Sequence, residues 1–395
     1  MRSARLFIAL GAVFTFLFVF AVRNTDSDTF KRFTTTPVEE ETTTEEGESY
    51  EQDPYVPGMT PELNSKLQKY KRANATFVTL ARNEDLEHLL PSIRSIQDRF
   101  NSRYHYDWVF LNNKEFSDEF KILTSRLITG EAKYGLINES HWSYPDWIDQ
   151  KKAAETRKQM KADDIIYGDN EQYRHMCRFE SGFFFHHPLM QQYRYYWRVE
   201  PETNLYCDIN YDVFKFMKDN DKKYGWTISI TEFEATIKTL WKTTKDFLSQ
   251  YPEALHENRL EKFVSFNNLD TYSLCHFWSN FEIADMEFWR GETYSKYFEH
   301  LDKAGGFFYE RWGDAPVHSI AASLFLDKDD IHYFDDIGYR HPPFYHCPAD
   351  QSQKGLSCAC MPEKTFDWHG SSCLRDYLRA KDIKFDEEYN KKKTT

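Results

Sequence analysis

The spacing of hydrophobic and polar residues changes period along the first half of the chain. Residues 75–80 and 107–111 are runs of β-branched and aromatic residues typical of strands, and residues 84–100 between them carry leucines and isoleucines at helical spacing. A strand, a helix and a second strand in this order predict a βαβ unit. The pattern therefore predicts an α/β protein.

The remaining elements are predicted from the same two periods. Helices are expected at 120–128, 153–161, 211–218 and 233–251, and strands at 134–138, 183–185, 195–199 and 226–230. The sequence contains no internal repeats. A non-repetitive mixture of strands and helices favours one mixed domain over a solenoid or a propeller.

The predicted strand at 195–199 ends at Pro201, which is flanked by Glu200 and Glu202. Ligands of α/β proteins bind beyond the carboxyl ends of strands, so an acidic pair there is well placed to hold a divalent cation against a diphosphate. The competing interpretation is that both glutamates lie on an ordinary surface loop. The Glu-Pro-Glu turn is therefore a candidate metal site.

The amino-terminal segment is apolar. Residues 6–22 contain one polar side chain, Thr15, and follow two arginines. Such a segment predicts a type II signal anchor, with residues 1–5 as a cytoplasmic tail and the bulk of the chain in the secretory lumen. The alternative is a signal peptide removed at Val19-Phe20-Ala21.

The next segment, residues 23–66, is rich in threonine and glutamate. It cannot bury enough apolar surface to offset its chain entropy, so an extended, disordered stem is expected. This leaves residues 67–395 as the folded lumenal domain, with a cysteine-rich segment at 347–373.

Composition narrows the function. The net charge of −13 argues against a nucleic-acid-binding protein. Aromatic residues make up 17% of the chain, which suits platforms for sugar rings, although an aromatic-rich core is the common alternative.

The seven cysteines suit an oxidising compartment, where disulfides are favoured over zinc. An odd number leaves at least one thiol unpaired or bonded to another molecule. Asn74 and Asn138 each begin an Asn-x-Ser/Thr sequence, so both are predicted glycosylation sites in the lumen.

Three further residues combine reactive side chains with unusual surroundings. Glu282 lies in a dense aromatic segment, where an acid is costly unless it is paired or used; a salt-bridged structural glutamate is the alternative. Asp314 ends a Trp-Gly-Asp sequence, and His341 precedes two prolines in a rigid turn. Carboxylate and imidazole ligands combined with diphosphate oxygens suit Mn²⁺ better than calcium.

Several enzyme classes lose their usual support. The first predicted strand is followed by neither Gly-x-Gly-x-x-Gly nor a P-loop, and neither Gly-x-Ser-x-Gly nor His-Glu-x-x-His occurs. Dinucleotide oxidoreductases, nucleoside triphosphatases, serine esterases and zincins are therefore disfavoured. His186 and His187 would point to opposite sides of a strand, so a structural role is expected for them.

Five segments are long and unusual: YGDNEQYRHMCRFESGFFFHHP, YYWRVEPETNLYCDINYDVF, YSLCHFWSNFEIADMEFWR, FFYERWGDAPVHS and GYRHPPFYHCP. They resemble those of the fungal Golgi α-1,2-mannosyltransferases, glycosyltransferase family fifteen, and the similarity runs from about residue 73 to residue 373. The resemblance implies a GT-A-like α/β fold with a mixed central sheet flanked by helices. It also implies GDP-mannose as donor, Mn²⁺ as cofactor, and retaining transfer to the 2-hydroxyl of α-mannose acceptors on O-linked or N-linked protein glycans.

The resemblance also implies residue roles. Glu200 and His341 would be metal ligands, and Glu282 would face the anomeric carbon as the nucleophile. A same-face mechanism would instead leave Glu282 with only an electrostatic role. Asp314 would contact or orient the acceptor.

Tyr173, Arg198 and Glu202 are expected to bind the donor, with Tyr173 against its phosphates. The family usually has Glu-Pro-Asp where this chain has Glu202, so the reach of that longer side chain is open. The expected location is the Golgi membrane, with a single-pass type II anchor. Two other functions compete with this one: a lumenal glycan-binding protein without catalysis, and a retaining glycoside hydrolase with two facing carboxylates and no nucleotide.

Overall fold

The computed structural model describes residues 70–385, which fall within one compact unit, Val56–Thr395. The predicted tail, anchor and stem at 1–66, and the predicted domain start at 67, lie outside the described residues. Within 70–385, no helix combines the length and the apolar character that a membrane crossing requires.

The predicted βαβ unit is confirmed. Strands β1 (Ala75–Leu80), β2 (Asp107–Asn112) and β3 (Ala132–Leu136) are parallel neighbours, and α2 (Leu86–Ile96) and α4 (Asp118–Ser125) connect them. The helix expected over 84–100 is shorter, because its last turn widens into a π-type turn at Gln97–Asn101 before α3 (Ser102–Tyr104).

The central sheet has seven strands in the order β10-β6-β9-β4-β1-β2-β3. The four added strands are β4 (Tyr195–Arg198), β6 (Tyr224–Trp226), β9 (Glu282–Asp285) and β10 (Ile331–Tyr333). Only β9 runs against its neighbours β4 and β6; the other strands share one direction. The mixed sheet implied by the family resemblance is therefore present. The reversal also brings the first residue of β9 to the edge where β4 ends.

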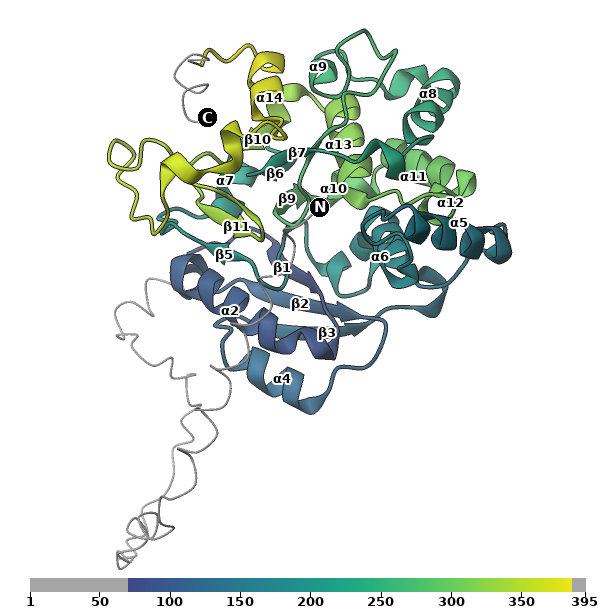
Figure 1. The fold of residues 1–395 in the computed structure, drawn as a ribbon. Helices are drawn as coiled ribbons and strands as arrows, with labels where there is room; N and C mark the ends of the chain where they lie inside the picture. The colour runs from purple at the N-terminus through teal and green to yellow at the C-terminus, as the bar shows by residue number, and fades with distance from the viewer. Residues whose placement is uncertain (1–69, 386–395) are drawn as a thin grey trace, which may run out of the picture. The chain divides into compact units, whose positions relative to one another are not determined.

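Two apolar layers cover the sheet, as the alternation along β4 requires: Tyr196 faces one cluster and Trp197 faces the other. The Trp197 face packs on α2, α4 and α7 (Val213–Asp219). The Tyr196 face packs on α6 (Glu171–Gly182), α8 (Leu240–Gln250), α11 (Glu292–Ala304) and α13 (Asp314–Phe325) (Figure 1). The other helices are α5 (Gln150–Ala162), α9 (Glu261–Val264), α10 (Met286–Arg290), α12 (Gly306–Tyr309) and α14 (Leu374–Ala380).

Two small sheets complete the fold. One has the order β12-β11-β5, from Phe344–His346, Tyr339–His341 and Asn204–Leu205; the other pairs β7 (Ser229–Thr231) with β8 (Cys275–Phe277). The β5–β11 pairing joins the segment after the Glu-Pro-Glu turn to the segment that ends at His341.

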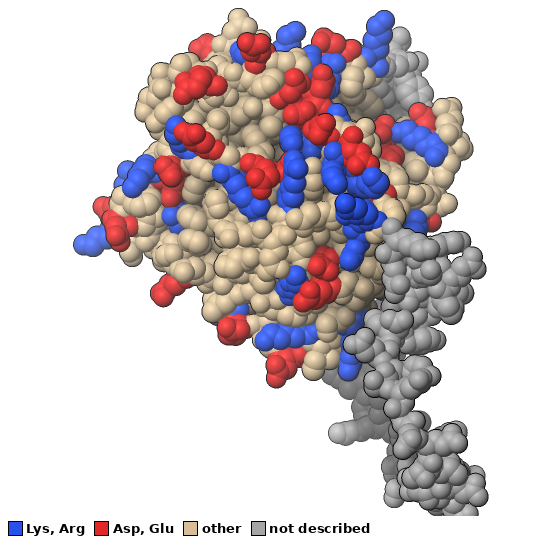
Figure 2. All heavy atoms as spheres, turned by 180° about the vertical axis from the view of Figure 1, so that it is seen from behind, with Lys and Arg blue, Asp and Glu red and all other residues tan. Residues whose placement is uncertain are grey.

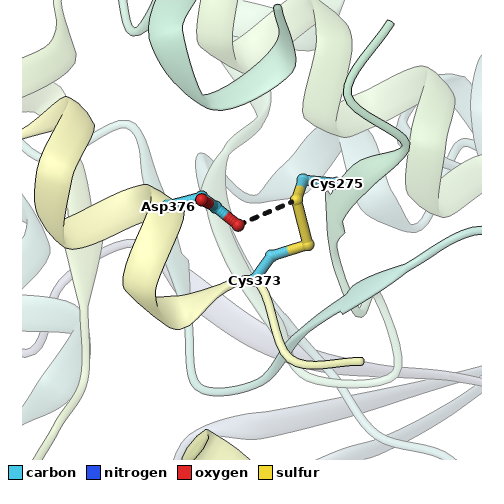
Figure 3. Close-up of side chains that lie close together, drawn as sticks. All are labelled: Cys275, Cys373 and Asp376. Carbon is cyan, nitrogen blue, oxygen red and sulfur yellow. Dashed lines mark hydrogen bonds between the residues drawn. A yellow bond between two sulfur atoms is a disulfide. The ribbon is translucent and has the colours of Figure 1, made fainter. Parts of the chain in front are cut away.

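The disulfides confirm the cysteine prediction. Bonds join Cys207 to Cys358, Cys275 to Cys373 and Cys347 to Cys360, while Cys177 is a buried free thiol. Asp376 lies beside the second bond (Figure 3), and these three residues are the one group of three or more possible metal ligands among residues 70–385. Disulfide sulfurs are not thiolates, so the group is not a metal site.

Two predicted strands and the start of one predicted helix are wrong. Residues 183–185 are not a strand: Phe183 still donates to the Phe179 carbonyl of α6, and Phe184–His186 is a 3₁₀ turn. A short apolar run does not distinguish a buried strand from a buried turn. The expected strand 226–230 divides between β6 and β7, which belong to different sheets.

The expected helix over 233–251 begins only at Leu240. Glu310 fixes this start, because its carboxylate accepts hydrogen bonds from the backbone N–H and the hydroxyl of Thr239. Glu310 is distant in sequence, so helical spacing alone did not locate the cap.

Candidate active site

The candidate site lies at the carboxyl edge of β4. The antiparallel register pairs Arg198, the last residue of β4, with Glu282, the first residue of β9. By alternation, both side chains lie on the sheet face that α6 and α13 cover. The reversed strand thus places a basic and an acidic residue side by side, in a position that the sequence pattern did not reveal.

Arg198 joins the carboxylates of the site. Its guanidinium donates to Asp314 Oδ2 at 2.5 Å and to Glu200 Oε1 at 2.6 Å, and it lies 3.9 Å from Glu180 Oε2. Arg198 was predicted to bind the donor. That role stays a prediction; in this structure its guanidinium binds two acidic residues of the site.

The two predicted metal ligands face each other. Glu200 Oε2 lies 3.5 Å from His341 Nε2, and both side chains are partly exposed. His341 Nδ1 lies 2.9 Å from the Pro342 carbonyl, which only accepts, so Nδ1 carries a proton and Nε2 is the ring atom that faces Glu200. The sequence prediction thus placed these two residues together correctly, while their ligand role stays a prediction.

Local hydrogen bonds hold Glu200 in place. The Thr203 hydroxyl donates to the Glu200 carbonyl at 2.8 Å, and the Glu202 N–H donates to the His88 carbonyl of α2 at 3.1 Å. Burial raises the pKa of Glu200, but Arg198 and His341 outweigh it and lower the pKa to about 2. Glu200 is therefore an anion at neutral pH, as a metal ligand must be.

The charge of the site favours a bound cation. Burial lowers the pKa of Arg198, but four carboxylates outweigh it and raise the pKa well above its usual value: Glu180, Asp314, Glu200 and Glu282. The ionised Glu200 and Asp314 share the single Arg198 guanidinium, and buried charge without compensation is costly. A divalent cation at Glu200 and His341 would reduce this imbalance, so the residues present fit the expected metal.

The Glu282 side chain is fully buried, with 0% of its area exposed. Its carboxylate accepts hydrogen bonds from the Tyr196 hydroxyl, from the Tyr224 hydroxyl at 2.8 Å and from His318 Nδ1 at 3.0 Å. The prediction that Glu282 is paired or used is thus met by a full set of donors. Its predicted role as a nucleophile stays a prediction.

Asp314 is the first residue of α13, where the helix dipole favours an anion. It accepts hydrogen bonds from Ser279 Oγ at 2.7 Å and from Arg198. Burial raises the pKa of Asp314, but Arg198, His318 and Ser279 outweigh it and lower the pKa. Asp314 is therefore a fixed negative charge beside the metal-ligand pair.

The other two predicted donor-binding residues are Tyr173 and Glu202. Tyr173 is on α6, stacked on Tyr167 at 4.7 Å between ring centres, with the Arg311 guanidinium 5.2 Å from its ring. Glu202 has a φ of 64° and a side chain that is 56% exposed and 3.2 Å from His88 Nδ1. Glu202 is thus oriented toward α2 rather than toward Arg198.

The two predicted glycosylation sites, Asn74 and Asn138, have exposed side chains. Asn74 directly precedes β1, and Asn138 lies two residues after β3. Their exposure is compatible with attached glycans.

Two buried residues of the site were not singled out from the sequence. Glu180 lies on the same face of α6 as Tyr173, seven residues later, and His318 follows Asp314 by one helical turn of α13. Helical spacing from residues already suspected was a usable signal for both.

Comparisons with known proteins identify the family of this chain. Residues 28–382 match the model of a family described as glycolipid 2-alpha-mannosyltransferase. The chain is 60% identical over 315 residues to alpha-1,2 mannosyltransferase KTR1 of Saccharomyces cerevisiae, covering 79% of this chain and 80% of that one. It is 57% identical over 324 residues to glycolipid 2-alpha-mannosyltransferase 2 of Candida albicans, covering 82% and 70%.

Solved structures are similar over most of the chain. Core-mannan synthase A (CmsA/Ktr4) of Aspergillus fumigatus, in its Mn/GDP form, has a TM-score of 0.75 at 38% identity, covering 86% of this chain and 93% of that one. The mannosyltransferase Ktr4p of S. cerevisiae in complex with GDP has a TM-score of 0.75 at 37% identity, covering 86% and 94%. These similarities confirm the predicted fold.

Proposed function

The chain belongs to the glycolipid 2-alpha-mannosyltransferase family, and we propose on that premise that it transfers mannose from GDP-mannose to the 2-hydroxyl of an α-mannoside. The transfer retains the anomeric configuration, and the acceptors are O-linked or N-linked glycans of glycoproteins. The observation that carries the proposal is the Glu200–His341 pair at the carboxyl edge of β4, beside Arg198 and Asp314.

Glu200 and His341 would hold Mn²⁺. The structure named as a Mn/GDP form has 38% identity to this chain, and the carboxylate–imidazole pair suits that ion. A divalent ion bound there would neutralise the negative charge that develops on the diphosphate as the sugar–phosphate bond breaks. Arg198 contributes by holding Glu200 in position, and the Nδ1–H of His341 contributes by fixing the ring orientation.

Glu282 fits an electrostatic role better than a nucleophilic one. A carboxylate that is 0% exposed and holds three donors would have to give them up before it attacked an anomeric carbon. In the same-face mechanism, the acceptor oxygen bonds to the anomeric carbon, the phosphate oxygen departs, and the hydroxyl proton moves to that phosphate. Negative charge at Glu282 then stabilises the oxocarbenium-like carbon, as carboxylates do in glycoside hydrolysis.

The proposed location is the Golgi membrane, with the catalytic domain in the lumen and a single-pass anchor at residues 6–22. Support comes from the apolar sequence of that segment and from the three disulfides, which suit an oxidising compartment. The face in Figure 2 shows acidic and basic side chains interspersed.

A donor panel tests the function. The purified protein is incubated with Mn²⁺, α-methyl mannoside and each of GDP-mannose, GDP-fucose, UDP-glucose and UDP-galactose. Product is expected from GDP-mannose alone. A glycoside hydrolase would release mannose without any nucleotide sugar, and a binding protein would give no product with any donor.

A thermal-shift measurement with GDP accompanies the panel. GDP with Mn²⁺ should raise the melting temperature, because a ligand that binds only the native state stabilises it. The absence of both product and shift would contradict the transferase proposal.

A further inference from the structure

The imidazole of His318 lies against the Glu282 carboxylate in the interior of the protein. Both side chains are 0% exposed. His318 Nδ1 is 3.1 Å from Oε1 and 3.0 Å from Oε2 of Glu282, so the ring contacts both carboxylate oxygens. A carboxylate only accepts when ionised, so Nδ1 carries the proton in this contact.

The ring has little freedom to turn away. It stacks on Trp289 with a centroid distance of 4.3 Å and an interplanar angle of 21°. The indole N–H of Trp289 donates to the Tyr196 hydroxyl at 3.0 Å, and that hydroxyl donates to Glu282. Trp289 therefore supports two of the three donors that hold the carboxylate.

The second ring nitrogen of His318 lowers the stability of the folded protein. His318 Nε2 is buried and has no hydrogen-bond partner among the described residues. An unpaired buried polar group costs about 1–3 kcal/mol, whereas an apolar side chain of similar size would avoid that loss. The position thus retains an imidazole at the expense of folding stability, which points to a role for its other nitrogen.

We propose that His318 is a positioning residue for the transfer reaction, whose Nδ1–H fixes the orientation of the Glu282 carboxylate. The inference rests on the proposed function and deepens it. Burial lowers the pKa of His318, but Glu282 and Asp314 outweigh it and raise the pKa. The proton needed for donation is therefore held firmly.

Strand β9 and helix α13 connect Glu282 and His318 to the candidate site. Glu282 pairs in register with Arg198, which binds Glu200 and Asp314. His318 lies one turn after Asp314 on α13. The helix that carries Asp314 into the site therefore also carries the donor that orients Glu282.

The test compares His318→Asn with His318→Leu. The asparagine amide can replace Nδ1–H as a donor to Glu282, while leucine removes the donor. His318→Leu should lower kcat by about 10- to 100-fold, the range for losing a hydrogen bond to a charged group, with little change in GDP affinity. His318→Asn should restore most of that loss.

A double-mutant cycle separates positioning from folding. If His318 acts through Glu282, adding His318→Leu to Glu282→Gln should lower kcat little further. Additive losses, or equal activities of the two His318 variants, would overturn the inference. If His318→Leu does not fold, the same cycle is run with His318→Ala, which also removes the donor, and additive losses there would likewise overturn the inference.

Ser323→Ala is the matched control. Ser323 is also fully buried on α13, and its hydroxyl has no partner among the described residues. Its replacement should leave kcat unchanged. Inactive wild-type protein in the same assay would contradict the proposed function, whereas active wild-type and active His318→Leu protein would contradict only the role of His318.

Discussion

Glu180 gives the protein a pH dependence of stability that a single substitution should remove. Its carboxyl is 4% exposed, and its ion-pair contact is the 3.9 Å approach to Arg198. Burial raises the pKa of Glu180, Arg198 lowers it, and Asp314 and Glu200 raise it again, with a result of about 7. Glu180→Gln keeps the shape of the side chain and removes the titration.

The size of the effect follows from the change in pKa on folding. The usual glutamate value is 4.5, and the folded value is about 7, so the folded protein holds this proton more tightly than the unfolded chain. The resulting stability is fully present below pH 4.5 and is lost as the pH rises through 7. At 1.36 kcal/mol for each pKa unit, the loss amounts to about 3 kcal/mol.

The assay is urea denaturation of wild type and Glu180→Gln at pH 5, 6, 7 and 8. The free energy of unfolding of the wild type should fall by about 2.5 kcal/mol relative to the variant between pH 5 and pH 8, which covers most of the full loss. Glu115→Gln, at an exposed position, is the control and should follow the wild type. Parallel pH curves for wild type and Glu180→Gln would refute the argument that Glu180 is protonated in the folded protein.

Three further predictions follow from the same contacts. Glu200→Ala should weaken Mn²⁺-dependent GDP binding by at least about tenfold in calorimetry. Glu202→Ala should change this affinity little, because the Glu202 side chain is exposed and lies beside His88. Equal losses in the two variants would place Glu202 on the metal. Asp314→Asn should lower kcat by about 10- to 100-fold, because it removes one of the two carboxylates that accept hydrogen bonds from the Arg198 guanidinium. Unchanged kinetics would show that Asp314 has no role in the reaction. Replacing Cys207 and Cys358 with alanine should cost about 2 kcal/mol more unfolding free energy than replacing Cys347 and Cys360, since the sequence separations are 151 and 13; equal costs in urea denaturation would contradict this loop-length argument.

Much of the fold was predictable because local patterns determine it. The βαβ unit follows from periods of apolar residues within about thirty positions. The start of helix α8 was not predicted, because its first turn depends on contacts of Thr239 with Glu310, which is distant in sequence. The turn at Phe184–His186 was taken for a strand because three adjacent aromatic residues fit either structure.

The candidate site was predictable only in part. Glu200 and His341 were expected together from a family resemblance, and the β5–β11 pairing explains how residues so distant in sequence meet. The position of Glu282 beside Arg198 was not foreseen, because it depends on the antiparallel course of β9 between β4 and β6. Strand order and direction are set by long-range contacts that one sequence does not display.

The most direct test of the central claim is the linkage formed by the purified protein with GDP-mannose, α-methyl mannoside and Mn²⁺. We predict a disaccharide with an α-configured 1,2-linkage, identified by NMR and by cleavage with an α-1,2-specific mannosidase. Its formation should stop with EDTA and resume with added Mn²⁺, since we propose that Glu200 and His341 hold the required ion. A β-linked product, or transfer that continues unchanged in EDTA, would contradict the account.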